Sequence, residues 1–239
     1  MPASQPPPLP LPRAAGRSHL WSVVIFLLLV SGVGIQAYRD LSRPEAWTYW
    51  KELYFAPSMT ASLFLAVDLG GKKRAALAIR GTIGEASASW FRERIDGVHL
   101  VAGDVILLSS PGGRLDQAVL MGEIIRSRGL VTAVGVVDSA GRISPSYCAS
   151  ACVIAYAGGE ARFGIEGSKL GVHRFSATTQ MDDPVADSQR VTGMLLGYMK
   201  KMGVSSTVVE AMSETRDIRW LGAKEVSAMN LVTDPVGWP

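Results

Sequence analysis

The chain has 239 residues, of which 48% are hydrophobic and 19% are charged, and its formal net charge is +3. Because no dense basic run accompanies this small charge, the sequence gives no indication of nucleic-acid binding. Two cysteines exclude a disulfide framework, and three histidines leave few candidates for histidine-based chemistry.

The N-terminal region is predicted to lie outside the folded domain. Residues 1–19 are rich in proline, which does not fit a helix interior, and we expect them to be disordered. Residues 20–38, LWSVVIFLLLVSGVGIQAY, carry no charge and can span about 30 Å of hydrocarbon as a helix. Trp21 and Tyr38 lie at its ends, where interfacial aromatic residues are common. We predict a transmembrane signal anchor; the alternative is a cleaved signal peptide, although no small-residue cleavage site follows.

Residues 39–60 are predicted to form a juxtamembrane linker that contains a short amphipathic helix. Trp47, Trp50, Leu53 and Tyr54 recur there at helical spacing, and we expect them to pack against the domain or the membrane surface. Basic residues lie on both sides of the apolar segment, so their count does not decide its orientation.

Residues 61–239 are predicted to form one α/β domain. Two strand-like runs flank Gly70 and Gly71 and indicate a hairpin, and the continuous apolar runs 104–110 and 130–137 are typical of buried parallel strands. Helical patterns cover 85–96, 114–129, 149–157 and 183–203, a turn and a strand are expected in 162–175, and a helix and a short strand end the chain. Strands that alternate with helices predict a mainly parallel sheet.

Three segments carry side chains suited to catalysis. SSPGG, 109–113, follows a buried strand, and its glycines would let backbone amides approach a ligand, although it can also be an ordinary turn. Ser150 in CASACVIAYAGG lies where a turn enters a helix, so it can be a nucleophile or merely a helix cap. His173 in KLGVHRF is the natural general base, because His99 lies in a loop and His19 adjoins the apolar segment.

The order of four motifs carries a family resemblance. ALAIRGTIG, VILLSSPGGRLDQAVLMGEIIRS, CASACVIAYAGGEARFGIEGSKLGVHRF and RDIRWLGAKEVSAMNLVTD follow one another between about residues 76 and 235. With these motifs the chain resembles the proteolytic subunit of Clp protease, within the Clp-crotonase superfamily, and especially membrane-anchored or exported bacterial Clp-like proteins. The resemblance implies a Clp/crotonase-like fold of stacked ββα units with a mainly parallel sheet.

The resemblance also implies roles for individual residues. Ser150 matches the nucleophile, His173 the general base, and the amides of Gly113 and Ala151 the oxyanion hole. The third member of the triad is expected to be Glu214, with Asp217 as the alternative acid. Asp182 and Asp183 are outside candidates for the same role.

Cys148 and Cys152 flank the candidate nucleophile. If residues 148–152 were helical, the Cα atoms of the two cysteines would lie about 6 Å apart, within disulfide range. A bridge would brace the nucleophile turn in an oxidising compartment. The alternatives are two small side chains packed in the core, Cys148 as nucleophile, or a metal site, for which further ligands are lacking.

These observations favour a membrane-anchored serine peptidase that needs no cofactor or metal and acts on peptides or unfolded proteins. We expect a homo-oligomer, anchored through residues 20–38, with the soluble domain on the periplasmic side. The alternatives are a non-catalytic Clp-like binding or assembly module and a crotonase-like acyl-CoA enzyme. The Ser/His pair and the lack of a basic patch for CoA phosphates argue against the acyl-CoA enzyme.

Overall fold

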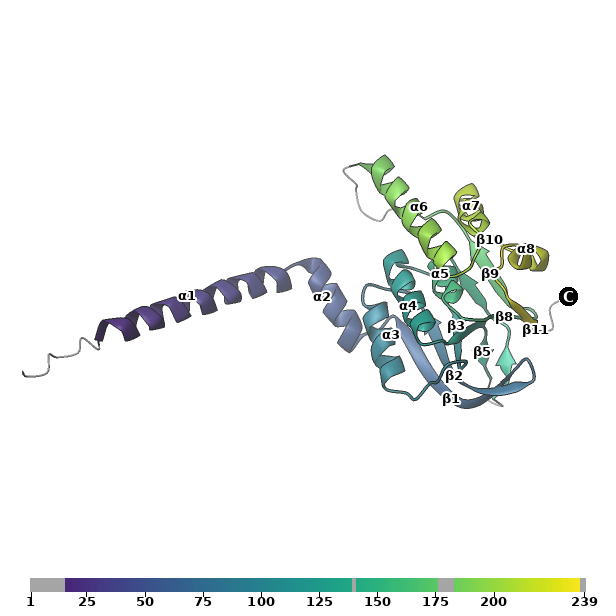
Figure 1. Ribbon diagram of the computed structural model, residues 1–239, viewed down its shortest axis with the longest axis horizontal. Coiled ribbons are helices and arrows are strands. Elements are labelled where there is room, and N and C mark those ends of the chain that lie inside the picture. The colour runs from purple at the N-terminus through teal and green to yellow at the C-terminus, as the bar shows by residue number, and fades with distance from the viewer. Residues whose placement is uncertain (1–15, 139–140, 176–182, 237–239) are drawn as a thin grey trace, which may run out of the picture. The chain divides into compact units, whose positions relative to one another are not determined.

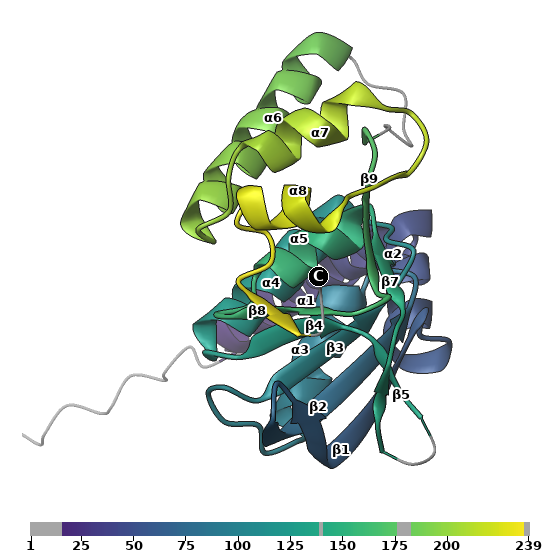
Figure 2. The same ribbon diagram turned by 90° about the vertical axis from the view of Figure 1, so that its right-hand side faces the viewer.

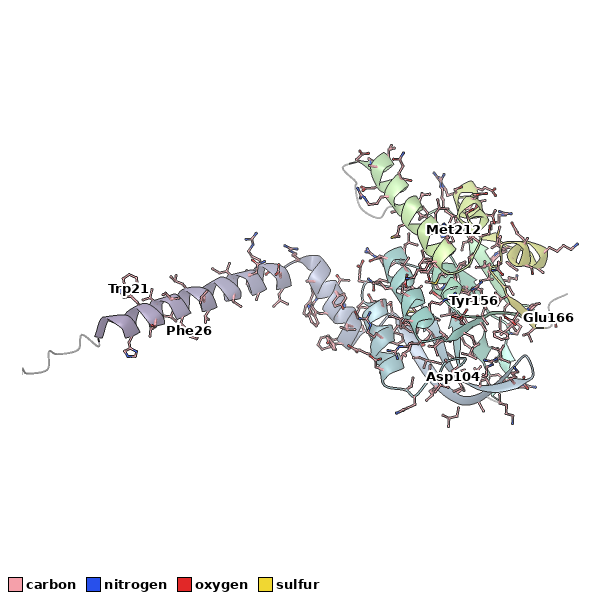
Figure 3. All side chains as sticks on the ribbon, viewed as in Figure 1. Trp21, Phe26, Asp104, Tyr156, Glu166 and Met212 are labelled. Atoms are coloured by element: carbon pink, nitrogen blue, oxygen red, sulfur yellow. A yellow bond between two sulfur atoms is a disulfide. The ribbon has the colours of Figure 1, made fainter. Side chains whose placement is uncertain are left out.

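The computed structural model describes residues 16–138, 141–175 and 183–236. The chain divides into two units, residues 1–47 and 48–239. In the first unit, residues His19–Leu41 of helix α1 (Gly16–Leu41) are long and apolar enough to cross a membrane. Trp21 and Phe26 project outward from this helix (Figure 3), and its other large apolar side chains are likewise exposed, so α1 is not a buried core helix.

The second unit contains the predicted α/β domain (Figure 1). Helix α2 (Pro44–Trp50) crosses the unit boundary and leads into a π-helical turn, η1 (Lys51–Phe55). The remaining helices are α3 (Ser87–Asp96), α4 (Leu115–Ser127), α5 (Ala151–Ala157), α6 (Pro184–Lys201), α7 (Thr207–Glu214) and α8 (Ala223–Ala228). The strands are β1 (Met59–Leu69), β2 (Lys72–Gly81), β3 (Val105–Ser109), β4 (Val131–Val134), β5 (Val136–Val137), β6 (Ile143–Ser144), β7 (Tyr147–Ala149), β8 (Arg162–Ile165), β9 (Lys169–Val172), β10 (Arg219–Trp220) and β11 (Asp234–Val236).

The main sheet has six strands in the order β1-β2-β3-β4-β8-β11. Strands β1 and β2 form the predicted hairpin around Gly70 and Gly71, which both have positive φ. All other neighbours in this sheet are parallel, which confirms the expected mainly parallel α/β fold. A second sheet, β10-β9-β7, meets the first where Ser110 forms a bridge with Cys148.

Both faces of the main sheet are buried at strands β3 and β4, which explains the continuous apolar runs of these strands. On β3, Ile106 and Leu108 face a core shared with α3, α4 and α5, whereas Val105 and Leu107 face the opposite side. Figure 2 shows these three helices on one side of the sheet, with the β5-β6 hairpin beside the other. Tyr156 of α5 lies fully buried in the helix-covered core (Figure 3).

Three elements differ from the sequence-based expectations. Residues 130–137 form not one strand but two, since β4 ends at Val134 and β5 pairs separately with β6. Residues 162–175 contain two strands in different sheets, because the turn at Gly167 redirects the chain. Helix α7 was not predicted. Leu53 of the expected linker joins the helix-covered core, in agreement with the expectation that this segment packs against the domain or the membrane surface.

One buried arginine joins the ends of three helices. Arg162 is only 2% exposed, and its guanidinium donates to carbonyl groups that follow α5, α6 and α8. These acceptors are Gly159, Met202, Asn230 and Leu231. Burial lowers the pKa of Arg162. Carbonyl groups accept four hydrogen bonds from its guanidinium, which has no carboxylate partner among the described residues.

Candidate active site

Ser150 has a backbone conformation that ordinary residues avoid. It connects β7 to α5 with φ +56° and ψ −128°, which costs a non-glycine residue about 1–3 kcal/mol. Its amide donates to Gly171 O at 2.8 Å and its carbonyl accepts from Val153 N at 3.0 Å. The side chain makes no capping hydrogen bond, so helix capping does not account for this serine.

The segment 109–113, called the glycine loop below, lies directly against the Ser150 turn. Gly112 has φ +99°, and a Cβ atom there would lie 2.6 Å from Ala149 O and 2.7 Å from Ser150 Cβ. Ser110 fixes this approach, because its carbonyl accepts from Ala149 N at 3.0 Å and its hydroxyl accepts from Gly112 N at 3.1 Å. Only glycine fits at position 112 without displacing the backbone.

Two backbone amides remain available next to Ser150. Gly113 forms a bridge with Ile83, but the bridge uses other donors: Ile83 N donates to Gly112 O at 2.8 Å, and Arg114 N donates to Ile83 O at 2.7 Å. Ala151 is the first residue of α5, where an amide has no acceptor within the helix. These are the two amides that the sequence assigned to an oxyanion hole.

His173 follows the strand next to the one that precedes Ser150. Strands β7 and β9 are parallel and pair Ala149 with Gly171, so Ser150 and His173 both lie at their carboxyl ends. The His173 Nδ1 atom lies 2.7 Å from Arg174 O. Because a carbonyl only accepts, this hydrogen bond requires the hydrogen on Nδ1, and in the neutral imidazole Nε2 then has the free lone pair. Within the described residues, no hydrogen bond joins Ser150 to His173.

Neither of the two main candidate acids is hydrogen-bonded to His173 in the described residues. Glu214 ends α7 and accepts from Arg219 at 3.0 Å. The backbone carbonyl of Asp217 accepts from the Thr215 hydroxyl at 2.6 Å, and its exposed carboxylate has no hydrogen-bond partner among the described residues. Neither carboxylate bonds His173, so the identity of the third triad member stays a prediction.

The other two candidate acids, Asp182 and Asp183, are not assigned as the third triad member either. Asp183 caps α6 by accepting from Ala186 N at 3.1 Å. Asp182 lies outside the described residues.

Cys148 and Cys152 are joined by a disulfide, with Cα atoms 5.3 Å apart. The bridge does not require residues 148–152 to be helical, because Cys148 belongs to β7 and Cys152 belongs to α5. The bridge therefore encloses the strained Ser150 and ties the strand before it to the helix after it. Both side chains are fully buried, and the described residues contain no cluster of metal-ligand type.

A pocket of about 590 Å³ opens between α6 and α7, beside the residues that follow His173. The sequence did not indicate this pocket, because α7 itself was not predicted. Its lining residues are Arg174, Phe175, Ser188, Thr192, Leu196, Ser206, Val209, Glu210 and Ser213.

No family model and no curated protein matches the sequence. Among solved structures, the chain is similar to ClpP1 from Listeria monocytogenes, with 14% identity over 67% of this chain and 90% of that chain and a TM-score of 0.48. It is also similar to a mutant of the 1510-N membrane-bound stomatin-specific protease, with 18% identity over 67% of this chain and 77% of that chain and a TM-score of 0.47.

Proposed function

We propose that the domain is a serine peptidase in which Ser150 is the nucleophile and His173 is the general base. The observation that carries the proposal is the strained Ser150 backbone next to the glycine loop, together with the amides of Gly113 and Ala151, which make no hydrogen bond among the described residues. A strained residue persists only when its surroundings hold it, and such residues gather at active sites. The glycine loop, the disulfide and the hydrogen bond to Gly171 hold this one.

The proposed reaction begins with attack of the Ser150 hydroxyl oxygen on the carbonyl carbon of a peptide bond. The Ser150 proton passes to His173 Nε2, the ring nitrogen with the free lone pair. The two amides stabilise the tetrahedral oxyanion, and each such donor is worth about 2.7–4 kcal/mol of barrier in measured cases. His173 then protonates the leaving amine, and water hydrolyses the acyl-enzyme.

The hydrogen bond between His173 and Arg174 O supports the role of the base in part. It fixes the tautomer in which Nε2 accepts a proton, which is the work that a carboxylate does in a triad. A neutral carbonyl stabilises the resulting imidazolium less than a carboxylate would. Catalysis would therefore gain if Glu214 or Asp217 replaced Arg174 O when substrate binds.

We further propose that the enzyme is anchored through residues 20–38 and acts as a homo-oligomer on peptides or unfolded proteins. The disulfide supports a periplasmic position of the domain, because buried bridges of this kind persist in oxidising compartments.

The test is labelling of the full-length chain, held in detergent micelles, with a fluorophosphonate probe. Wild type and a Ser227→Ala control should be labelled, since Ser227 is an exposed serine of α8 with no role in the proposed site. Ser150→Ala should abolish labelling, and His173→Ala should lower its rate at least 100-fold. Labelling that persists in Ser150→Ala would refute the assignment of the nucleophile.

A second candidate function is a non-catalytic binding module. The absence of a hydrogen bond between Ser150 and His173 in the described residues, and the pairing of Glu214 with Arg219, favour this alternative. A correctly folded wild type that is never labelled would support it.

A further inference from the structure

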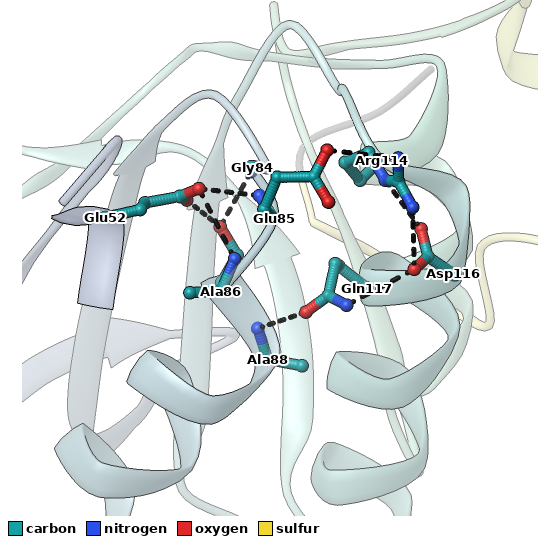
Figure 4. A network of polar contacts seen from close by, with 9 residues as sticks. Glu52, Gly84, Glu85, Ala86, Ala88, Arg114, Asp116 and Gln117 are labelled. Atoms are coloured by element: carbon teal, nitrogen blue, oxygen red, sulfur yellow. Dashed lines mark hydrogen bonds and ion pairs between the residues drawn. The ribbon is translucent and has the colours of Figure 1, made fainter. Parts of the chain in front are cut away.

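Glu52 is the centre of a polar network that joins η1 to the loop before α3. It lies in η1, in the segment that follows the apolar helix along the chain. Its carboxylate accepts from the amides of Glu85 at 2.6 Å and Ala86 at 3.3 Å (Figure 4). It also accepts from the hydroxyls of Ser58 at 2.6 Å and Ser87 at 3.2 Å. Four donors on one carboxylate form a dedicated anchor rather than a surface ion pair.

The loop that Glu52 holds is shaped to receive the carboxylate. A Cβ atom at Gly84 would lie 2.1 Å from Glu52 Oε1, so a side chain at this position would displace the carboxylate. Gly84 N also donates to the Ser87 hydroxyl at 2.8 Å, which orients that hydroxyl toward Glu52. Residues 82–87 are thus positioned by the segment before β1.

The same loop is the structural support of the oxyanion glycines. Ile83 accepts from Arg114 N and donates to Gly112 O, so it holds the residues on both sides of Gly113. Beyond this backbone bridge, the Glu85 carboxylate accepts from Arg114 Nη1 at 3.1 Å (Figure 4). These three hydrogen bonds all involve Gly112 or Arg114, the two neighbours of Gly113 in the chain.

Arg114 is anchored on its far side as well. Its guanidinium donates to both carboxylate oxygens of Asp116, at 3.0 and 3.2 Å. Partial burial opposes ionisation of Asp116, but hydrogen bonds from Arg114 and Gln117 and the charge of Arg114 outweigh it, so the pKa of Asp116 lies below its ordinary value. Gln117 in turn accepts from Ala88 N at 3.1 Å, which closes the network onto α3.

We propose that Glu52 is a positioning residue that couples the juxtamembrane segment to the oxyanion hole. Its carboxylate fixes loop 82–87, that loop fixes Gly112 and Arg114, and Gly113 is held between them. The reactivity of Ser150 then depends on η1 being seated against the domain. This inference rests on the proposed peptidase function, because it assigns a role to the Gly113 amide.

The experiment compares Glu52→Gln with the matched control Glu93→Gln in the full-length chain in detergent. Both changes remove one negative charge, but Glu93 is an exposed α3 residue whose side chain has no described partner. Glutamine keeps the shape of Glu52 but turns one acceptor oxygen into a donor, which opposes the donors around it. The Gly113 amide should shift, and a small displacement of a catalytic group costs about 10-fold to 100-fold in rate.

Two readouts are measured. Glu52→Gln should lower the maximal rate of fluorophosphonate inactivation, kinact, about 10-fold while leaving the probe affinity KI unchanged, because the oxyanion forms only in the chemical step. Hydrogen–deuterium exchange should become faster in peptides covering both 82–88 and 110–116. The Glu93→Gln control should match wild type in both measurements.

Faster exchange in 82–88 alone, or an unchanged kinact in a labelled enzyme, would overturn the coupling. If wild type is not labelled at all, the proposed peptidase function fails, and exchange at 110–116 alone decides whether Glu52 controls the glycine loop. Should Glu52→Gln not fold, Glu52→Asp takes its place with the same expected direction, since it keeps the charge but shortens its reach.

Discussion

Gly112 lies so close to Ser150 that a Cβ atom added to Gly112 would be 2.7 Å from the Ser150 Cβ. Gly112 also has φ +99°, a region that L residues rarely adopt. The glycine loop can therefore approach the nucleophile turn only because this position has no side chain.

We expect Gly112→Ala to abolish fluorophosphonate labelling and to lower the free energy of unfolding by about 2–4 kcal/mol, from overpacking and backbone strain together. Gly71→Ala is the matched control, because Gly71 also has positive φ but nothing within 4 Å of the added Cβ. It should cost about 1 kcal/mol and leave labelling intact. Denaturant unfolding and labelling of both variants test this. An equal loss of unfolding free energy in the two variants would show that the close contact between Gly112 and Ser150 does not affect stability.

Ser150 itself should show a trade between stability and reactivity. Its φ of +56° is strained for serine but accessible to glycine, so Ser150→Gly should raise the free energy of unfolding by about 1 kcal/mol while abolishing labelling. Ser150→Ala should abolish labelling without that gain, because alanine keeps the strain. Urea unfolding distinguishes the two, and a Ser150→Gly variant no more stable than Ser150→Ala would argue against a strained turn.

Local periodicity predicted the parts of the fold that local sequence controls. The apolar run 104–110 became β3 and the amphipathic pattern 114–129 became α4, because burial on two faces or on one face imposes those patterns. The local sequence does not show which distant strand a segment pairs with. For this reason 162–175 was expected to contain one strand rather than two strands in different sheets. Helix α7 is eight residues long and contains Val208 and Val209, so neither length nor propensity marked it.

The sequence predicted the site residues whose positions follow from motif order and strand ends. It did not predict which of several nearby groups a flexible side chain would bond. Ser150 and His173 follow adjacent parallel strands, as the order of the motifs implied. Whether Glu214 meets His173 or Arg219 depends on how β10 is placed, which local sequence does not specify. The role of Glu52 could not be predicted either, because the two amides that its carboxylate accepts from lie 33 and 34 residues further along the chain.

The close packing of α4 against α5 gives a prediction about Gly158. A Cβ atom there would lie 2.3 Å from Gly122 O and 2.5 Å from Gly122 Cα, and these are backbone atoms that cannot rotate away. Gly158→Ala should therefore destabilise the domain by about 1–3 kcal/mol. Gly193→Ala, in the exposed face of α6 with nothing within 4 Å, should instead stabilise it by about 0.5–1 kcal/mol. Thermal unfolding of the pair checks both signs, and stabilisation by Gly158→Ala would show that the two helices are not in backbone contact.

The Cys148–Cys152 bridge is the last feature that a direct measurement can decide. Both sulfur atoms are buried, so neither cysteine of the full-length native chain should react with iodoacetamide. Unfolding in guanidinium without reductant should still leave both unmodified, and unfolding with reductant should yield two alkylated cysteines by intact mass. Two alkylations without reductant would mean instead that the cysteines are small side chains packed in the core.

The energetic contribution of the bridge follows from the short loop that it closes. Loop-closure entropy for so few residues corresponds to about 2 kcal/mol, so the Cys148→Ala, Cys152→Ala double variant should lose about that much unfolding free energy relative to the oxidised wild type. Reduced wild type is the matched control, because it lacks the bridge but keeps both sulfur atoms. Since the bridge encloses Ser150, both forms should also be labelled more slowly by the fluorophosphonate than the oxidised enzyme. Equal labelling in all three forms would show that hydrogen bonds and the glycine loop alone hold the nucleophile turn.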